Sequence, residues 1–350
     1  MNTTAKMAAK VIGLDIAKNV FVAVGLDEKG KSVYKKQMSR SEVISTFRTM
    51  EATKIAIESC SGSHYWAREL QALGHEVMLI AAQHTRAYVT GNKNDTNDAA
   101  AIAEAASRVS TKSVPINSQT QQDLQMLLRT RTALMAERTA LINRMRAFAG
   151  EYGQVFALGV AKFRSAFVRW LGDEENGLSG SALTTFRELK AELDDKEERI
   201  EVYDRRIVAA TRADERALRL LEIPGVGKLT AAAVVASVAD ARHFGSGRDF
   251  AANLGLVPRE HSSGGKQRLM GITKRGDSYL RTLLVHGARS ALRCAGEKPD
   301  RMLRWALKIA ERRGNKVAAV ALANKMARII WAMLAHERSY EKVWHNATPV

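Results

Sequence analysis

Short apolar runs rich in β-branched residues open this chain and then alternate with helical patterns, and this order restricts the fold more than any other feature of the sequence. The first three runs are Val11–Ile16, Val20–Leu26 and Lys31–Met38, and the turn-forming residues Asp-Glu-Lys-Gly separate the last two. The beginning of the chain therefore predicts three antiparallel strands.

Helices and strands then alternate as far as Arg108. Ser41 is placed to cap a helix, and we expect further elements at Glu42–Met50 (helix), Lys54–Glu58 (strand), Tyr65–Leu73 (helix), Glu76–Ala81 (strand) and Asn97–Arg108 (helix). This order predicts a mixed sheet with helices packed on it, as in a ribonuclease H-like domain. The pattern alone leaves other α/β folds open.

Two series of apolar residues spaced by seven follow, the first in a helical stretch from Gln119 to about Phe148. The members are Leu127, Leu134, Leu141 and Phe148, then Phe186, Leu193, Ile200 and Ile207. Such heptads predict two long helices in an antiparallel coiled-coil hairpin. We expect the hairpin to be a spacer or an oligomer contact rather than a catalytic element.

Glycine-rich turns and basic helices replace this pattern after Leu221, and Ile223–Gly227 marks the start of another domain. We therefore expect the class α/β plus α, with three domains at 1–115, 116–218 and 219–350. The last should be mostly helical.

The positive charge of the chain indicates a polyanion as partner. There are 54 lysines and arginines against 37 aspartates and glutamates, a net charge of +17 at pH 7, and nucleic acid is the leading candidate. From Arg259 onwards, 19 basic residues stand against 7 acidic ones. The C-terminal quarter should carry most of the phosphate-attracting surface, unless the charge only solvates helical faces.

Neither the cysteines nor the apolar segments indicate a secreted or membrane protein. Cys60 and Cys294 are isolated, without the spacing of a disulfide framework or a zinc site. The first residues are polar, and polar or charged residues interrupt the later apolar stretches, so we expect no signal peptide and no membrane span. A reducing cytoplasm fits.

Four carboxylates stand where they could meet. Asp15 interrupts an apolar strand, where an uncompensated charge is costly, and Glu58 ends another predicted strand. Asp95 and Asp98 are spaced by three at a helix start and face the same side. Oxygen ligands without histidine or cysteine select hard cations such as Mg²⁺ or Mn²⁺, which assist phosphoryl transfer. For either helix aspartate alone, a helix cap is the simpler interpretation.

Two later segments are candidate contacts to a polynucleotide. Gly225, Gly227 and Lys228 form a turn that resembles a DNA-binding helix-hairpin-helix turn, although a Pro-Gly turn between helices would look much the same. Pro258–Lys266 is predicted to be a polar loop with a serine that could act as a nucleophile, but surface loops often hold serines without a function. Further basic candidates near this loop are Lys266, Lys274 and Arg275.

Four segments together resemble the DEDD transposases, the Piv-like, bridge-RNA-guided serine recombinases of insertion sequences: Gly13–Lys18, Ile57–Ser59, Lys93–Ala99 and Pro258–Gly265. The likeness extends over nearly the whole chain. It implies a RuvC-like N-terminal domain, a coiled-coil region and a C-terminal transposase domain.

The resemblance also implies residue roles. The four carboxylates match those of the family in order, as metal ligands. The family's nucleophilic serine precedes a glycine after a Gly-Leu-x-Pro segment, which here falls on Ser263, with Ser262 as the fallback. In such an enzyme the serine attacks a DNA phosphodiester while bound metal stabilises the charge, and strands are then exchanged.

Partners are implied in the same way. They are double-stranded DNA from the element ends and the target, a noncoding guide RNA that chooses the sites, and further copies of the chain, with a tetramer expected. We expect no membrane partner and a cytoplasmic, nucleoid-associated location.

Three other functions compete with this interpretation. A RuvC-type Holliday-junction endonuclease would activate water at the carboxylates, and Ser263 would only contact phosphate. An actin-like sugar kinase also opens with a Gly-x-Asp strand, but here Ala17, Lys18 and Asn19 replace the small residues that its phosphate loop prefers. A non-enzymatic DNA or RNA scaffold needs only the charge and the glycine turn, and metal-dependent activity lost in Asp15→Ala would exclude it.

Overall fold

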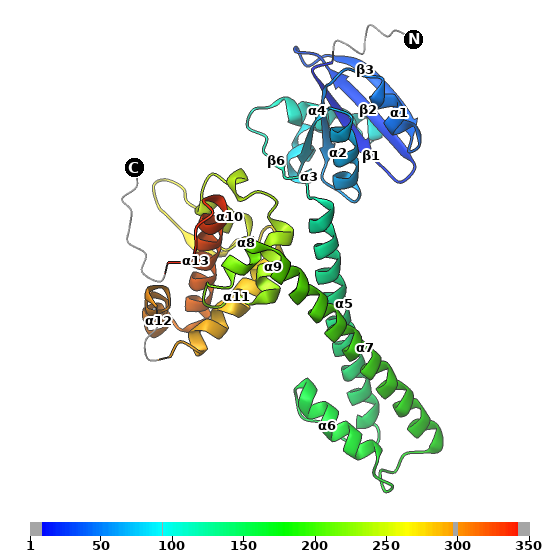
Figure 1. The fold of residues 1–350 in the computed structure, drawn as a ribbon, viewed down its shortest axis with the longest axis vertical. Helices are drawn as coiled ribbons and strands as arrows, with labels where there is room; N and C mark the ends of the chain where they lie inside the picture. Colours follow the sequence, from blue (N-terminus) through cyan, green and yellow to red (C-terminus); the bar gives the residue numbers. More distant parts are fainter. Residues whose placement is uncertain (1–8, 93, 297–299, 342–350) are drawn as a thin grey trace. The chain divides into compact units, whose positions relative to one another are not determined.

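The computed structural model describes residues 9–92, 94–296 and 300–341, and the chain divides into two compact units, Met1–Ser118 and Gln119–Val350 (Figure 1). The first unit is a sheet with helices on it, and the second is mostly helical. The predicted class, an α/β region followed by a helical one, is confirmed. The finer division into three domains stays a prediction.

A six-stranded sheet with the order β3-β2-β1-β4-β5-β6 forms the first unit. Its first three strands are antiparallel, as predicted, and β4 and β5 run parallel to β1. The carboxyl ends of β1 and β4 therefore lie at the same edge of the sheet. The strands are β1 (Val11–Ile16), β2 (Val20–Leu26), β3 (Ser32–Ser39), β4 (Lys54–Glu58), β5 (Glu76–Ile80) and β6 (Ser113–Val114).

Helices cover both faces of this sheet. On one face, α1 and α2 enclose a core that includes Phe21, Phe47 and Trp66, and full burial of one such side chain contributes about 1.5–3 kcal/mol. On the other face, α4 packs over Val22 and Ala56. The helical elements are α1 (Glu42–Arg48), α2 (Ser63–Ala72), α3 (Ala82–Thr85), the 3-10 turn η2 (Arg86–Tyr88) and α4 (Asp95–Ser107).

Several boundaries in this unit differ from the predicted ones by one or two residues. Ser41 does not cap α1, because its backbone is already helical (φ −71°, ψ −24°), and the Glu42 carboxylate instead accepts a backbone N–H from the end of β3 at 2.7 Å. α4 begins at Asp95, before the predicted start at Asn97, because the Asn94 side chain accepts the N–H of Asn97 at 2.8 Å. No pattern predicted β6, which is two residues long.

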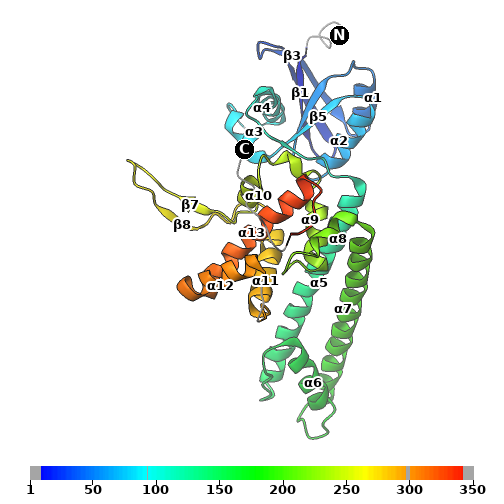
Figure 2. The same ribbon diagram turned by 60° about the vertical axis from the view of Figure 1, so that its left-hand side comes forward.

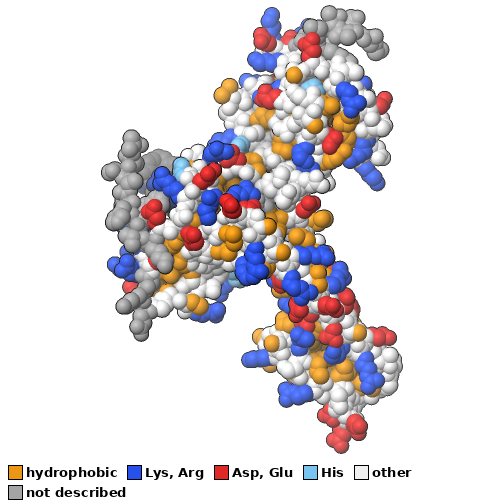
Figure 3. Space-filling model, viewed as in Figure 1, with side chains coloured by type: hydrophobic (Ala, Val, Ile, Leu, Met, Phe, Trp, Pro, Cys, Tyr) orange, Lys and Arg blue, Asp and Glu red, His pale blue; other side chains and the backbone are white. Residues whose placement is uncertain are grey.

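Two long helices begin the second unit and confirm the predicted hairpin: α5 (Gln119–Gly150) and α7 (Gly180–Ala213). Their antiparallel direction follows from cross-helix ion pairs, since Arg131 pairs with Asp204 and Glu137 pairs with Lys196 at 3.1 Å. On the face drawn in Figure 3, acidic and basic side chains lie side by side along these helices. Their surface is thus charged but mixed in sign.

The two heptad series differ in burial. All four members in α7 are buried, as the spacing predicts: Phe186, Leu193, Ile200 and Ile207. In α5, however, only Leu134 and Leu141 are buried, whereas Leu127 is half-buried and Phe148 is 45 % exposed. Ile142 and Met145 are buried in the last turns instead. The prediction was wrong for Phe148, because a helix of 3.6 residues per turn drifts away from a strict seven-residue repeat. An aromatic cluster around α6 (Val160–Leu171) closes this end of the hairpin.

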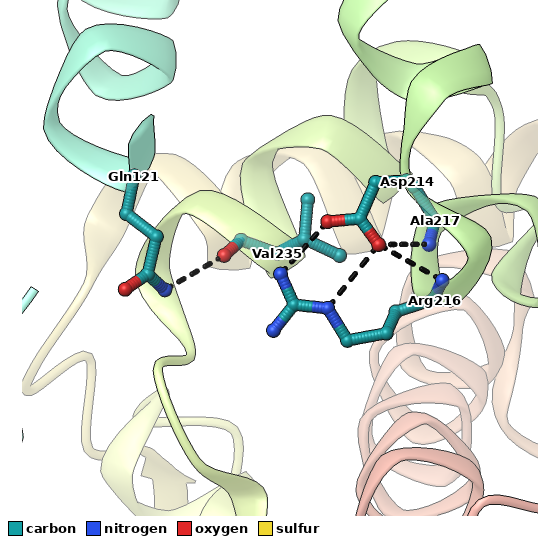
Figure 4. A network of polar contacts seen from close by, with 5 residues as sticks. All are labelled: Gln121, Asp214, Arg216, Ala217 and Val235. Carbon is teal, nitrogen blue, oxygen red and sulfur yellow. Dashed lines mark hydrogen bonds and ion pairs between the residues drawn. The ribbon is translucent and has the colours of Figure 1, made fainter. Parts of the chain in front are cut away.

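A hydrophobic core formed by the remaining helices includes the other ends of α5 and α7. Figure 4 shows polar contacts there: the Gln121 amide donates to the Val235 carbonyl at 3.0 Å, and the Asp214 carboxylate accepts the N–H groups of Arg216 and Ala217. Burial opposes ionisation of Asp214, yet its hydrogen bonds with Arg216 hold its pKa below the usual value. The elements are α8 (Glu215–Leu220), α9 (Lys228–Ser237), η3 (Ala241–His243), α10 (Gly247–Asn253), β7 (Pro258–Glu260), β8 (Leu269–Ile272), α11 (Ser278–Arg293), α12 (Arg301–Arg313) and α13 (Asn315–Ala335).

The last helix, α13, is long and apolar enough to cross a membrane by length and composition alone, a test that the core helix of a globular protein also passes. Its buried side chains include Leu322, Met326 and Ile330, and it packs against α10, α11 and α12. Burial inside its own unit accounts for the apolar sequence of this helix.

Candidate active site

The predicted carboxylates lie at the edge of the sheet where β1 and β4 end. In these parallel neighbours Leu14 pairs with Ile57, so the residues that follow, Asp15 and Glu58, stand side by side. Because side chains alternate along a strand, both belong to the face that α4 covers. Two acidic side chains thus meet at one end of the sheet.

Helix α4 approaches β1 very closely at Gly13. A Cβ atom on Gly13 would stand 2.0 Å from the carbonyl oxygen of Ala99 and 2.5 Å from the backbone nitrogen of Ala103, so only glycine fits. The first turn of α4 carries Asp95 and Asp98. Close packing at Gly13 therefore brings these two aspartates to the end of β1.

The four carboxylates interact electrostatically. Burial, together with the charges of Asp95, Asp98 and Glu58, raises the pKa of Asp15 to about 6. Burial and the charges of Glu58 and Asp15 also raise the pKa of the Cys60 thiol. The structure brings all four predicted carboxylates into one acidic site, hereafter the acidic site, on β1, β4 and α4.

Neither aspartate in the first turn of α4 is its cap. The Asn94 side chain takes that role, so capping does not explain why Asp95 and Asp98 are acidic. Negative charge near a helix N-terminus is favourable, but each aspartate also faces the charge of Asp15. Lys93, part of the same motif, lies outside the described residues.

The donor set of the acidic site fits a hard divalent cation. Its ligands would be carboxylate oxygens, which Mg²⁺ and Mn²⁺ prefer, and no cationic side chain in the described part of the chain lowers the pKa of Asp15. Within the same described segments, no three histidine, cysteine, aspartate or glutamate side chains already form a ligand cluster. The carboxylates would have to turn toward one another around an ion, whose charge reverses their mutual repulsion.

Thr85 contacts Glu58, and no pattern in the sequence pointed to it. It ends α3, is 2 % exposed, and its hydroxyl donates a hydrogen bond to the Glu58 carboxylate, with the Ala82 carbonyl 3.0 Å away. A hydroxyl has one proton, so only one of these oxygens receives it. The contact orients the Glu58 carboxylate. A single threonine in a four-residue helix carries no spacing signal that sequence reasoning could use.

Packing explains part of the glycine turn before α9. A Cβ atom on Gly225 (φ 91°) would stand 2.7 Å from the carbonyl oxygen of Gly287 in α11, so this backbone contact requires glycine. Gly227 has open space around it and precedes Lys228, the first residue of α9, a helix without a side-chain cap. Both residues are exposed, so the start of α9 is accessible to a ligand.

Ser263 stands at the tip of a β-hairpin. β7 and β8 pair antiparallel, and Ser263 pairs with Lys266 across Gly264 (φ 56°) and Gly265 (φ 77°). Positive φ at both central residues is typical of the type I′ turn that closes two-residue hairpins. Figure 2 shows the hairpin extending away from the helices of its own unit. Of the predicted polar loop, only Pro258–Glu260 is a strand, whereas 261–266 lies outside β7 and β8 apart from the bridge between Ser263 and Lys266. The strands were not predicted, because they lack the apolar alternation by which strands are recognised.

The two neighbouring serines differ in their hydrogen bonds. The Ser262 hydroxyl donates to the Glu260 carboxylate at 2.6 Å and accepts the N–H of Arg268 at 3.3 Å. The exposed Ser263 hydroxyl makes no hydrogen bond to a described residue. Ser263 is thus the freer of the two. The basic residues predicted to bind nucleic acid in this region are all exposed: Lys266, Lys274 and Arg275.

Two family models match the chain. One, described as the transposase IS116/IS110/IS902 family, matches residues 217–307, which include the glycine turn and the hairpin. The other, described as a transposase and named for the DEDD enzymes of IS110, matches residues 12–153, which include the acidic site.

Individual relatives match almost the whole chain. A protein described as "Probable family 20 transposase" from Pseudomonas aeruginosa is 48% identical over 94% of this chain and 98% of its own length. The transposase for insertion sequence element IS1111A of Coxiella burnetii is 44% identical over 95% of this chain and 91% of its own length. The transposase of element IS1328 of Yersinia enterocolitica is 38% identical over 95% of this chain and 98% of its own length. Identity of this extent shows that the chain belongs to the IS116/IS110/IS902 family of DEDD transposases.

Proposed function

We propose that this chain is the transposase of an insertion sequence and that it cuts double-stranded DNA at the acidic site and rejoins it. Membership of a transposase family supports DNA as the substrate and cutting and rejoining as the reaction. The juxtaposition of Asp15 and Glu58 at the ends of paired strands, with the aspartates of α4 brought there by the close contact at Gly13, carries the assignment of the site, and the raised pKa of Asp15 agrees with it. Such a convergence of acids is rare unless it has a function.

The carboxylates of Asp15, Glu58, Asp95 and Asp98 would hold Mg²⁺ or Mn²⁺. Bound there, a divalent cation supplies Lewis-acid stabilisation of the charge that develops during phosphoryl transfer. The protein orients the ligands: Thr85 fixes the carboxylate of Glu58, and the glycine contact between β1 and α4 fixes the aspartates. The net charge of +17 draws DNA toward an enzyme whose candidate site is itself acidic.

Cleavage of DNA that carries the element ends tests this assignment. Asp15→Asn and Glu58→Gln should each lower the cleavage rate by roughly a thousandfold or more, because each removes a charged ligand, while DNA binding stays. Glu76→Gln is the matched control, since Glu76 is an exposed acid at the opposite end of the parallel strands. Normal cleavage by Asp15→Asn would refute the assignment.

A ribonuclease H-like, RuvC-like fold is our proposal for the first unit. Support comes from three antiparallel strands followed by two parallel ones in the order β3-β2-β1-β4-β5, with helices on both faces. The acids on β1 and β4 then occupy central neighbouring strands. Fold likeness is an analogy, so the function rests on the site itself.

Ser263 is the nucleophile in this proposal. Its oxygen would bond to phosphorus, one phosphodiester P–O bond would break, and the departing DNA oxygen would take up the proton that the serine loses. Attack by a DNA hydroxyl on the serine ester then rejoins a strand without ATP. The free, exposed hydroxyl of Ser263 supports this choice over Ser262, whose hydroxyl is engaged.

A covalent protein–DNA adduct on denaturing gels tests the nucleophile. Ser263→Ala should abolish the adduct and recombination, whereas Ser262→Ala should keep both. A RuvC-type Holliday-junction endonuclease would cut through metal-activated water and leave no adduct in any variant. An undiminished adduct in Ser263→Ala would contradict the assignment.

The exposed basic residues support a nucleic-acid contact in the second unit. Gly227 and Lys228 would bind a backbone phosphate at the start of α9, next to the packed Gly225. Around the hairpin, phosphate contacts would come from Lys266, Lys274 and Arg275. The resemblance described above supports a noncoding guide RNA as a further partner, and RNA that copurifies with the protein can be sequenced to test it. The site of action would be the nucleoid in the cytoplasm.

We propose a homotetramer as the assembly. Exposed apolar side chains gather near α6 at one end of the α5–α7 hairpin, in a group hereafter called the hairpin-end patch: Phe148, Tyr152, Val155, Leu158 and Val168. Val155 and Leu158 are 86% and 85% exposed. Exposed apolar groups of this kind mark contact sites between chains.

A further inference from the structure

The hairpin of β7 and β8 carries apolar side chains that its own unit leaves open. Residues 258–271 are all exposed, and among them Leu269 is 55% and Met270 36% exposed. A two-stranded ribbon is only marginally stable by itself, and usually packs one face on a core. Here both large side chains stay in solvent, so a partner that covers them is expected.

The charged residues around Leu269 and Met270 indicate the chemical class of the partner. Arg259, Lys266 and Arg268 lie on the ribbon, and Glu260 is the one acidic residue between positions 258 and 275. Glu260 is engaged, because it accepts the Ser262 hydroxyl at 2.6 Å. A ribbon of this charge attracts a polyanion and repels a second copy of itself.

The base of the ribbon packs tightly against the helices of its own unit. A Cβ atom on Gly255 would stand 2.4 Å from the carbonyl oxygen of Arg275, and one on Gly276 would stand 1.7 Å from the last carbonyl oxygen of α10, so both strands leave the body through tight backbone contacts. The Arg281 guanidinium donates to the carbonyls of Leu254 and Arg275 at 2.9 and 2.8 Å. The base of the ribbon is therefore closely packed against α10 and α11.

The backbone at the base of the ribbon is also strained. Lys274 has φ 56°, a left-handed conformation that residues with a side chain rarely adopt. Its N–H donates to the Gly255 carbonyl at 3.1 Å, which helps to hold this conformation. Backbone strain of this kind persists where the surrounding structure enforces it, and it is common where a segment must be aimed at a ligand.

We propose that this ribbon enters a groove of duplex DNA and that Leu269, the more exposed of the two, wedges between adjacent base pairs and unstacks them, while Met270, on the opposite face of the ribbon, contacts the groove wall. A two-stranded ribbon fits a DNA groove, and leucine is among the side chains that DNA-bending proteins insert between base steps. Arg268 precedes the two apolar residues directly and would hold a phosphate beside the opened step.

The proposal rests on DNA as the substrate of this transposase and adds a step to its use. Ser263 stands at the tip of the same ribbon, so the distortion would fall near the phosphodiester that it attacks. Unstacking is least costly at flexible pyrimidine–purine steps such as TA and CA. The wedge would therefore favour such a step at the cleavage site without reading its bases.

Fluorescence of 2-aminopurine, placed at successive positions of a duplex that carries the element end, tests the wedge. The full-length protein should raise the fluorescence at one step, and Leu269→Ala/Met270→Ala should remove most of this rise and weaken binding roughly tenfold. Leu269→Met/Met270→Leu conserves apolar volume and should restore both. Leu218→Ala is the matched control, since Leu218 is a 43% exposed leucine on α8.

A fluorescence rise in Leu269→Ala/Met270→Ala as large as in the wild type would overturn the proposal. If light scattering also showed that this variant had lost its oligomers, the two side chains would be assigned to a contact with another copy of the chain. Because both side chains are exposed, we expect the variant to melt like the wild type.

Asp15→Asn separates this proposal from the proposed function. That variant should unstack DNA normally and fail to cleave it. If it cleaves normally while Leu269→Ala/Met270→Ala loses the fluorescence rise, the wedge stands and the acidic site has been assigned wrongly. If Asp15→Asn fails to cleave while Leu269→Ala/Met270→Ala still unstacks DNA, the assignment of the acidic site stands and the wedge is refuted.

Discussion

At the residue scale, Asp15 illustrates how a functional side chain opposes the fold that carries it. It lies in a strand whose neighbours Val11, Ile12 and Leu14 are buried, and its pKa is raised because burial and three nearby carboxylates disfavour its charge. Nothing in the packing of β1 requires an acid at this position. The presence of an acid here is explained by the cation that it would bind. Without a bound cation, the charge of Asp15 therefore lowers the stability of the fold.

Asp15→Asn should therefore stabilise the metal-free protein at high pH. Because burial and the neighbouring carboxylates raise the pKa of Asp15 from 3.8 to about 6, the folded state binds a proton more tightly than the unfolded state, and stability falls as the pH rises between these values. The uncharged amide in Asp15→Asn cannot ionise, so the variant does not lose this stability as the pH rises. We expect a gain of about 1 kcal/mol at pH 8, after screening by solvent at a partly exposed group, and a smaller gain at pH 5.

Thermal unfolding in EDTA at both pH values measures this difference. Equal melting temperatures of wild type and Asp15→Asn at pH 8 would show that the carboxylates do not repel one another.

Thr85 allows a second prediction at this scale. Its hydroxyl orients the Glu58 carboxylate, and loss of such a supporting contact typically lowers metal affinity about 10- to 100-fold. Thr85→Val should weaken Mn²⁺ binding, measured by the electron paramagnetic resonance of free Mn²⁺, and Thr85→Ser should restore it. Equal Mn²⁺ affinity in wild type and Thr85→Val would show that the Thr85 hydroxyl does not support metal binding.

At the scale of elements, the buried strands could be predicted from the sequence and the exposed ones could not. The bounds of β1, β2 and β4 agree with the structure because continuous apolar runs signal strands covered on both faces. β7 and β8 could not be predicted, since exposed strands need no apolar pattern, and the position of α6 was missed as well. In the acidic site, Asp15 stands out in sequence, whereas the contact of Thr85 depends on a tertiary position that no local pattern encodes.

Gly13→Ala should show that the contact between β1 and α4 builds the acidic site. A methyl group there would collide with the backbone of Ala99 and Ala103, which cannot yield without moving α4. We expect a loss of stability of about 1–3 kcal/mol and a large loss of cleavage in the fraction that stays folded.

Urea unfolding and DNA cleavage measure the two effects. Gly180→Ala is the control, because Gly180 begins α7 with open space around it and alanine favours a helix. Wild-type stability and cleavage in Gly13→Ala would contradict the close approach of α4.

At the scale of the whole molecule, the candidate chemistry is divided between two compact units. The acidic site lies in the first, whereas the serine hairpin and most of the excess positive charge belong to the second. The family models match residues 12–153 and 217–307, and the segment between them contains α6 and all of α7. Exposed apolar side chains near the start of that segment, Val155, Leu158 and Val168, suit an assembly contact better than a catalytic role.

Val155→Asp/Leu158→Asp should reduce the oligomer to smaller species. Both side chains belong to the hairpin-end patch, and burying an unpaired carboxylate in an interface is strongly unfavourable. Multi-angle light scattering gives the mass, and Val109→Asp, at a fully exposed valine of the first unit, is the control. An unchanged mass would mean that the patch is not the contact between chains.

The central claim is that Asp15, Glu58, Asp95 and Asp98 hold one divalent metal centre, and anomalous diffraction from crystals grown with Mn²⁺ tests it most directly. We predict an anomalous peak at the ends of β1 and β4, with carboxylate oxygens about 2.1 Å away, the spacing typical of magnesium-type sites. A peak bound only by other residues, or no peak at these carboxylates at saturating Mn²⁺, would contradict the account.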